Sequence, residues 1–271
     1  MSQDKTSQPI GIFDSGIGGL TIAKAIVEKL PKESIVYFGD TAHLPYGEKS
    51  AEVICRYAKR IVDKLLLEKC KLILIACNSA SAAAYDFLQE YIGDRALLIN
   101  VIDPMVQFLK CHYQHKYVGL IGTKLTINSK IYHEKIRELG VDIKLHALAT
   151  PLLVPAIEEG FFQHPIIDVL LEEYLSDKKL ENIDALVLGC THYPVIKKSI
   201  EEFYQKRIAI IDAAPIVAEE VKKVLKAHKL LSHGKKGNKH FFVSDYTAAF
   251  AKGAKMFFGE NIKLEHYSMV E

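Results

Sequence analysis

The chain has 271 residues, of which 49% are hydrophobic, enough to bury a sizeable core in one large or two smaller domains. Its net charge of +2, from 35 basic and 33 acidic residues, gives no general attraction to nucleic acid or to a membrane surface. The polar residues 1–8 do not resemble a signal peptide, and no apolar run approaches the roughly 18 residues of a membrane span, so we expect a cytoplasmic protein.

Candidate strands alternate with helical patterns along almost the whole chain. Short apolar runs rich in Ile, Leu and Val predict strands, and longer amphipathic runs predict helices. Repeated units of this kind predict an α/β fold built on mostly parallel, doubly wound sheets. The predicted strands lie at 9–13, 34–40, 72–77, 96–103, 117–122, 141–149, 185–190, 208–214 and, as the last, 240–245. The predicted helices lie at 21–30, 50–68, 81–92, 129–139, 165–175, 218–228 and 247–258.

In one segment, basic residues are not balanced by acidic ones as they are in the chain as a whole. Residues 221–240 include seven lysines and no acidic residue. The segment has no arginine and no RNA-binding motif, which favours a solvated helix face over an anion-binding patch. Its glycines predict a hairpin after that helix.

Four landmarks recur in the same order at nearly constant separation, which predicts two copies of one α/β unit. We therefore expect two similar lobes related by pseudo-twofold symmetry, facing each other across a cleft. The landmark pairs are Gly11 and Gly119, Thr41 and Thr150, Cys77 and Cys190, and Asp103 and Asp212.

Cys77 and Cys190 each end an apolar run and precede polar residues typical of a helix start. Ligands bind at that edge of a parallel sheet, and a helix N-terminus there lowers the pKa of a thiol. Two facing lobes would present one thiol from each side of the cleft. One thiolate could then remove a proton from a substrate carbon while the other sulfur, as a thiol, protonates the opposite face. That sequence of events inverts a stereocentre.

The five cysteines are widely spaced and include no CxxC pair and no Cys/His cluster with zinc spacing. We therefore expect free thiols, with neither a disulfide framework nor a structural metal. Cys55, Cys70 and Cys111 have no counterparts in the other half of the chain, and we predict structural roles for them.

Two titratable residues at the same edge could assist the thiols: Asp14 in the turn FDSGIGGL, and His192 two residues after Cys190. Their alternative roles are an N-cap aspartate and a hydrogen-bonded loop histidine. The glycines of that turn follow G-x-G-G and not G-x-G-x-x-G, and a carboxylate at its mouth would repel phosphate, so dinucleotide binding is not expected. Four small polar residues could hold a substrate carboxylate or act as helix caps: Ser15, Asn78, Ser79 and Thr191.

The segments FDSGIGGL, GDTAHLPYG, ACNSAS, VPAIEEG and GCTHYP, in this order, resemble those of the glutamate racemases, which belong to the aspartate/glutamate racemase superfamily. The resemblance implies interconversion of L- and D-glutamate without a cofactor, so neither pyridoxal phosphate nor a metal is expected. It implies that D-glutamate feeds bacterial peptidoglycan synthesis. It also implies two α/β lobes between which the chain crosses twice, residues 1–99 completed by 213–271 and residues 100–212.

Carried over residue by residue, the resemblance makes Cys77 and Cys190 the catalytic acid/base pair. It implies that Asp14 assists the first thiol, and that Glu158 and His192 assist the second. Without the resemblance, Glu158 would be interpreted as a solvated helix carboxylate. The family's usual Asn-Thr after the first cysteine is Asn-Ser here, which keeps the hydroxyl and loses a methyl. The implied substrate contacts are Asp14, Ser15, Tyr46, Gly47, Asn78, Ser79, Thr191 and His192, with Thr123 as a weaker candidate.

Three other functions stay open at this point: an aspartate racemase of the same superfamily, a cysteine hydrolase using Cys190 and His192, and a two-lobed amino-acid-binding protein without catalysis. The expected partner is a small-molecule substrate, and we expect a homodimer with no direct contact to membrane or nucleic acid. Some members of the resembled family bind DNA gyrase. The lysine-rich segment 221–240 gives no support for or against such binding here.

Overall fold

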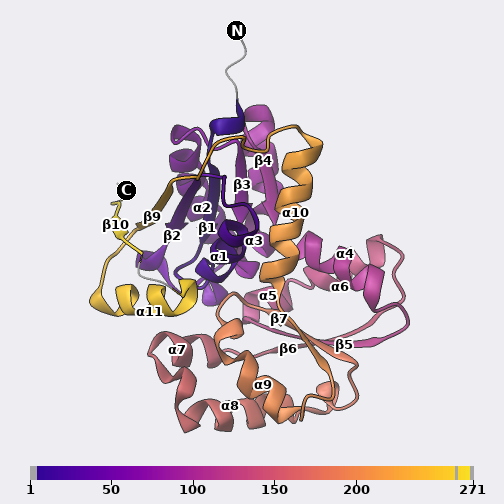
Figure 1. The fold of residues 1–271 in the computed structure, drawn as a ribbon. Helices are drawn as coiled ribbons and strands as arrows, with labels where there is room; N and C mark the ends of the chain where they lie inside the picture. Colours follow the sequence, from indigo (N-terminus) through magenta and orange to yellow (C-terminus); the bar gives the residue numbers. More distant parts are fainter. Residues whose placement is uncertain (1–4, 260–261, 269–271) are drawn as a thin grey trace.

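The computed structural model describes residues 5–259 and 262–268, which form two parallel sheets covered by helices (Figure 1). The first lobe is built on a six-stranded sheet in the order β10-β9-β2-β1-β3-β4, and the second lobe on a four-stranded sheet in the order β6-β5-β7-β8. All neighbouring strands pair in parallel. The two-lobed α/β class expected from the sequence is confirmed.

Most strands are short and buried, as parallel strands covered on both faces must be. The strands of the first lobe are β1 Ile10–Asp14, β2 Ile35–Gly39, β3 Leu72–Ile75, β4 Leu97–Asn100, β9 Lys239–Val243 and β10 Leu264–His266. Those of the second lobe are β5 Tyr117–Gly122, β6 Lys144–Ala149, β7 Ala185–Gly189 and β8 Ala209–Ile211.

The helices mostly follow the strands one by one. They are α1 Leu20–Lys29, α2 Ala51–Leu67, α3 Asn78–Ile92, α4 Ile102–His112, α5 Lys124–Asn128, α6 Ile131–Glu138, α7 Leu153–Glu158, α8 Pro165–Leu175, α9 Lys197–Phe203, α10 Ala213–Ala227 and α11 Ala248–Phe258. Among the described residues, none of these helices combines the length and the apolar character needed to cross a membrane.

The internal duplication is visible in the sheet order, because β2-β1-β3-β4 and β6-β5-β7-β8 repeat one pattern. Gly11 in β1 and Gly119 in β5 hold the same place, each paired with strands on both sides. A Cβ at Gly11 would lie 2.9 Å from Sγ of Cys70, and one at Gly119 would lie 2.7 Å from Cδ1 of Ile183. Both glycines therefore let a side chain pack directly on the strand, which gives Cys70 the structural role predicted for it.

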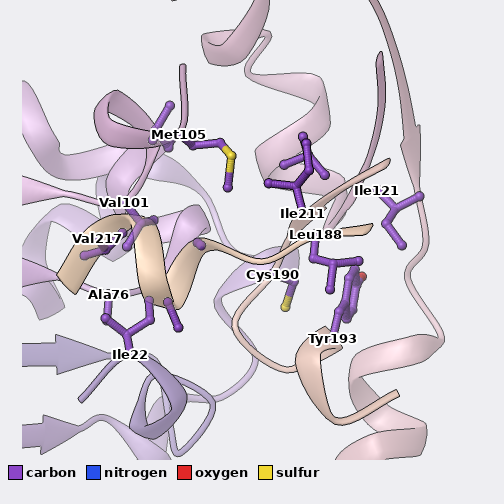
Figure 2. Packing of buried hydrophobic residues seen from close by; sticks show 14 of the residues in the cluster. Ile22, Ala76, Val101, Met105, Ile121, Leu188, Cys190, Tyr193, Ile211 and Val217 are labelled. Carbon is purple, nitrogen blue, oxygen red and sulfur yellow. The ribbon is translucent and has the colours of Figure 1, made fainter. Parts of the chain in front are cut away.

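One apolar core runs from the first lobe into the second. Figure 2 shows Cys190 between residues of the two lobes. A second cluster fills the other face of the first sheet, under α2 and α3. The shared core packs the two lobes against each other, which places the carboxyl ends of their strands face to face. The labelled first-lobe residues include Ile22, Ala76 and Val217, and the labelled second-lobe residues include Ile121, Leu188, Tyr193 and Ile211.

The predicted strand 96–103 is too long, because β4 ends at Asn100 and α4 starts at Ile102. The Asn100 side chain explains the switch: its Oδ1 accepts hydrogen bonds of 2.8 Å from the backbone N–H groups of Ile102 and Asp103. These bonds satisfy two backbone N–H groups in the first turn of α4, which have no acceptor within the helix itself. The three-residue strand β10 also lies beyond the predicted last strand.

The hairpin predicted within segment 221–240 is wrong. After α10 the chain continues into β9, which pairs in parallel with β2. Gly237 allows this path, since a Cβ there would lie 1.9 Å from the carbonyl oxygen of Glu33. The solvated helix face is confirmed, because Lys223 and Lys226 are exposed.

Candidate active site

A cavity of about 310 Å³ lies where the carboxyl ends of the strands in the two lobes face each other. Both Cys77 and Cys190 line it. The other lining residues predicted from the sequence are Ser15, Tyr46, Gly47, Asn78, Ser79, Thr123, Thr191 and His192. Those not predicted are Leu44, Pro45, Glu48, Lys124, Thr150, Pro151, Leu152, Val154, Pro155 and Gly189.

Cys77 follows β3 and is itself the N-cap residue of α3, a place expected for the polar residues after it. Its Sγ accepts a hydrogen bond from the N–H of Ala80 at 3.4 Å and donates one to Oγ of Ser15 at 3.6 Å. Burial, reinforced by the negative charge of Asp14, raises the pKa of the Cys77 thiol to about 12. The expectation of a lowered pKa is therefore wrong for this thiol, because burial outweighs the helix N-terminus. Cys77 holds its proton at neutral pH.

Asp14 ends β1 and is fully buried behind the cavity wall, which it does not line. Its Oδ2 accepts from the N–H of Gly16 at 3.1 Å, and its Oδ1 accepts from the hydroxyl of Thr191 at 3.3 Å. Burial raises the pKa of Asp14, although the nearby His192 and these hydrogen bonds act in the opposite direction. The carboxylate thus links the turn after β1 to the second lobe.

Cys190 follows β7, and its Sγ lies 3.8 Å from Nδ1 of His192. On the far side of the ring, Nε2 of His192 lies 3.0 Å from Oε1 of Glu158, but off the N–H axis, so the contact is an ion pair and not an aligned hydrogen bond. Burial disfavours the imidazolium, yet the contacts with Cys190 and Glu158 outweigh it and raise the pKa of His192 well above its usual value. Glu158, at the end of α7, does not line the cavity and reaches Cys190 only through His192. We call these three residues the Cys190 relay.

Small polar side chains cover the wall beside Cys77. Ser79 Oγ lies 2.8 Å from Oγ1 of Thr123, so the weaker candidate Thr123 does join the wall from the second lobe. The hydroxyl of Tyr132 donates to Oδ1 of Asn78 at 2.8 Å and fixes the orientation of that amide. The described residues contain no group of three or more His, Cys, Asp or Glu side chains that could hold a metal ion.

Gly18, in the turn after β1, allows the two lobes to approach closely, and Gly19 allows the turn to pack on Asp14. A Cβ at Gly18 would lie 2.6 Å from both Nδ1 of His192 and Oγ1 of Thr191, and one at Gly19 would lie 2.6 Å from Cβ of Asp14. These contacts explain by packing why glycine stands at both positions.

Sequence reasoning missed the part of the wall that follows β6, residues 150–155. A signal for it was present, because Thr150 is the counterpart of Thr41 in the internal repeat. Thr150 Oγ1 lies 2.6 Å from the hydroxyl of Tyr193, which holds it beside the loop that carries Cys190. The unpredicted prolines and Leu152 make this side of the cavity apolar.

Comparison with known proteins agrees with this arrangement. Residues 10–221 match the family model described as Asp/Glu/Hydantoin racemase. A glutamate racemase of Chlorobaculum parvum is 43% identical over 265 residues, 97% of each chain. The glutamate racemase of Francisella tularensis, solved in complex with D-glutamate, superposes with a TM-score of 0.91 at 38% identity over 97% of this chain and 98% of that one. The Thermus thermophilus glutamate racemase, in complex with beta-chloro-D-alanine, superposes with a TM-score of 0.86 at 36% identity, with the same coverage. The resemblance found in the sequence motifs is confirmed, and this chain belongs to the Asp/Glu/hydantoin racemase family.

Proposed function

We propose that this protein interconverts L- and D-glutamate, with Cys77 and Cys190 as its two acid/base groups. One observation carries the proposal: two thiols from different lobes line a single cavity. A substrate whose α-carbon lies between them would present one face to each sulfur. A proton could then leave one face while another arrives at the opposite face, which inverts the centre.

The two thiols have different surroundings, and this suits the two roles. Cys77 is held as a neutral thiol by burial and by Asp14, so it is ready to donate a proton. Cys190 can exchange a proton with the ring of His192, whose other nitrogen contacts Glu158. In the reverse direction the roles of the two sulfurs are exchanged.

The main energetic difficulty is the weak acidity of an amino acid α-proton, which a thiolate alone cannot overcome. The site must stabilise the developing negative charge by hydrogen bonds to the substrate carboxylate and by keeping water out. We propose Ser15, Asn78, Ser79 and Thr191 for these hydrogen bonds, because all four line the cavity. Closure of the two lobes would exclude water.

Glutamate is favoured over aspartate because the similar chains described above are glutamate racemases, one of them solved with D-glutamate. The same relationship supports a peptidoglycan role for the product and a cytoplasmic location. We further propose that the lobes divide near residues 99 and 213. Independence from cofactors and a homodimeric assembly stay predictions from the resemblance.

Incubation of the purified protein with L- or D-glutamate in deuterated water tests the function. We expect both enantiomers to lose the NMR signal of the α-proton and the circular dichroism to decay to zero, because the two enantiomers have equal free energy. Parallel incubations with L- and D-aspartate, alone and as competitors, test the alternative substrate. Faster exchange of aspartate would identify an aspartate racemase, and tight binding of glutamate without exchange would identify a binding protein.

We expect Gly18→Ala to lower kcat/KM for glutamate by about tenfold or more, because a shift of the lobes misplaces groups that must act within hydrogen-bond distance. The added methyl would clash with His192 and Thr191. Steady-state racemisation followed by circular dichroism measures the effect. Gly234→Ala is the matched control, since a Cβ there meets no atom closer than 3.5 Å. Equal activity of the two variants would contradict the packing role of Gly18.

A further inference from the structure

Asp40 is a fully buried carboxylate that the proposed chemistry does not use. It follows β2 and does not line the cavity. Its Oδ2 accepts a hydrogen bond of 2.5 Å from the hydroxyl of Tyr46, and Tyr46 and Gly47 form part of the cavity wall. The carboxylate therefore lies directly behind that wall.

Two further donors reach the other oxygen of Asp40. Nδ1 of His43 and the hydroxyl of Ser244 each lie 2.7 Å from Oδ1. The ring of His43 stacks on Tyr57, with 3.9 Å between centroids, so its orientation is fixed as well. A buried carboxylate needs such partners, and with three of them its position is well defined.

Ser244 brings the C-terminal part of the chain into this network. It lies just after β9, 204 residues from Asp40. Besides donating to Asp40, its Oγ accepts a hydrogen bond of 2.9 Å from the N–H of Ala42. Next to it, the Thr41 hydroxyl donates to the carbonyl of Asp245 at 2.6 Å. The chain from Asp40 to Ala42 is thus held against the segment that follows β9, and Tyr46 is joined to it through Asp40.

We propose that Ser244 is a positioning residue for the substrate cavity. Acting through Asp40, it holds Tyr46 and Gly47 in place as one wall, so the segment that follows β9 sets the affinity for the amino acid without touching it. The effect on affinity rests on the proposed function, whereas the effect on the wall does not. The sulfurs of Cys77 and Cys190 are not part of this network. Loss of the Ser244 hydroxyl therefore leaves the proton-transfer steps unaltered.

The variant Ser244→Ala removes both hydrogen bonds of the hydroxyl. We expect backbone amides within residues 41–49 to exchange hydrogen about tenfold faster or more, as follows from losing a hydrogen bond to a charged group. We expect KM for glutamate to rise about tenfold in each direction with kcat changed less than about twofold. Ser244→Thr keeps the hydroxyl and should restore both values. Asp40→Asn, which keeps the shape but supplies its own donor, should show the same pattern as Ser244→Ala.

Ser34→Ala is the matched control. It removes the 3.2 Å hydrogen bond from the N–H of Asn238 at the opposite end of the β2 and β9 pair. We expect exchange in residues 41–49 and KM to stay at wild-type values. Unchanged exchange in Ser244→Ala would overturn the positioning role, and so would a fall in kcat at constant KM. A wild-type protein that does not racemise glutamate would overturn the proposed function, while the exchange measurement would still decide whether Ser244 holds the wall.

Discussion

Replacing either Cys77 or Cys190 by serine is expected to lower the rate of glutamate racemisation by about a thousandfold or more, because a hydroxyl is a far weaker acid than a thiol. Serine is nearly the same size as cysteine, so the cavity should keep its shape. Since each sulfur is proposed to serve one face of the α-carbon, neither can replace the other. Circular dichroism of purified variants with each enantiomer measures the loss.

Isotope exchange with the same variants separates the two roles. A variant that keeps only one thiol can exchange the α-proton of the enantiomer whose hydrogen faces that thiol, but cannot complete the inversion. We therefore expect Cys77→Ser and Cys190→Ser to prefer opposite enantiomers in deuterated water. Loss of racemisation in only one variant, or in neither, would contradict the two-base mechanism and would favour a single nucleophilic cysteine.

Cys70→Ser is the control for these variants. Cys70 is also buried, and burial raises its pKa to about 12, as for Cys77. It lies outside the cavity and packs against Gly11. We expect its replacement to leave the rate unchanged at temperatures where the variant is folded. A similar loss of rate would mean that burial, and not position at the cavity, explains the effect.

The fold class and most of the cavity wall could be predicted because the relevant signals are local. Cys77 and Cys190 stand directly after apolar runs, and the carboxyl ends of parallel strands meet at one edge of a sheet. Glu158 has no such local signal, since its role depends on the distance from α7 to His192 across the second lobe. It was found only through the family motif.

Other features of the site depend on tertiary structure and could not be predicted. Asp40 and Ser244 are 204 residues apart, and no pattern in either segment indicates that they meet. The raised pKa of Cys77 is a second example: the helix N-terminus was correctly placed, but the degree of burial was not available from the run LILIAC. Local patterns thus locate functional atoms, and packing decides their protonation.

We expect Lys71→Met to lower the free energy of unfolding by about 3–5 kcal/mol, because it leaves a buried charge without its partner. Lys71 immediately precedes β3, and its side chain is completely buried. Its Nζ donates to Oε2 of Glu33 and to the carbonyl of Thr6, each at 2.6 Å, and to the carbonyl of Leu230 at 2.8 Å. Urea unfolding followed by far-UV circular dichroism measures the change.

Two further variants show whether the buried charge is the cause. In the double variant Lys71→Met/Glu33→Met no charge stays buried, so we expect much of the stability to return. Lys198→Met removes a lysine from an exposed pair with Glu202 and should cost less than about 1 kcal/mol. A double variant as unstable as Lys71→Met would indicate that the hydrogen bonds to the backbone carbonyls, and not the charge, are responsible.

The Lys71–Glu33 pair also holds the chain segment between α10 and β9 in place, because Oε1 of Glu33 accepts a hydrogen bond of 2.7 Å from the N–H of Ser232. This contact lies at the amino end of the first sheet, whereas Ser244 lies at the carboxyl end, beside the cavity. Lys71→Met should therefore lower stability while leaving KM for glutamate unchanged at temperatures where the variant is folded, and Ser244→Ala should raise KM with a smaller loss of stability. A rise in KM for Lys71→Met would show that the contacts at Ser232 and at Ser244 act together. The whole chain from Ser232 to Ser244, and not Ser244 alone, would then shape the cavity.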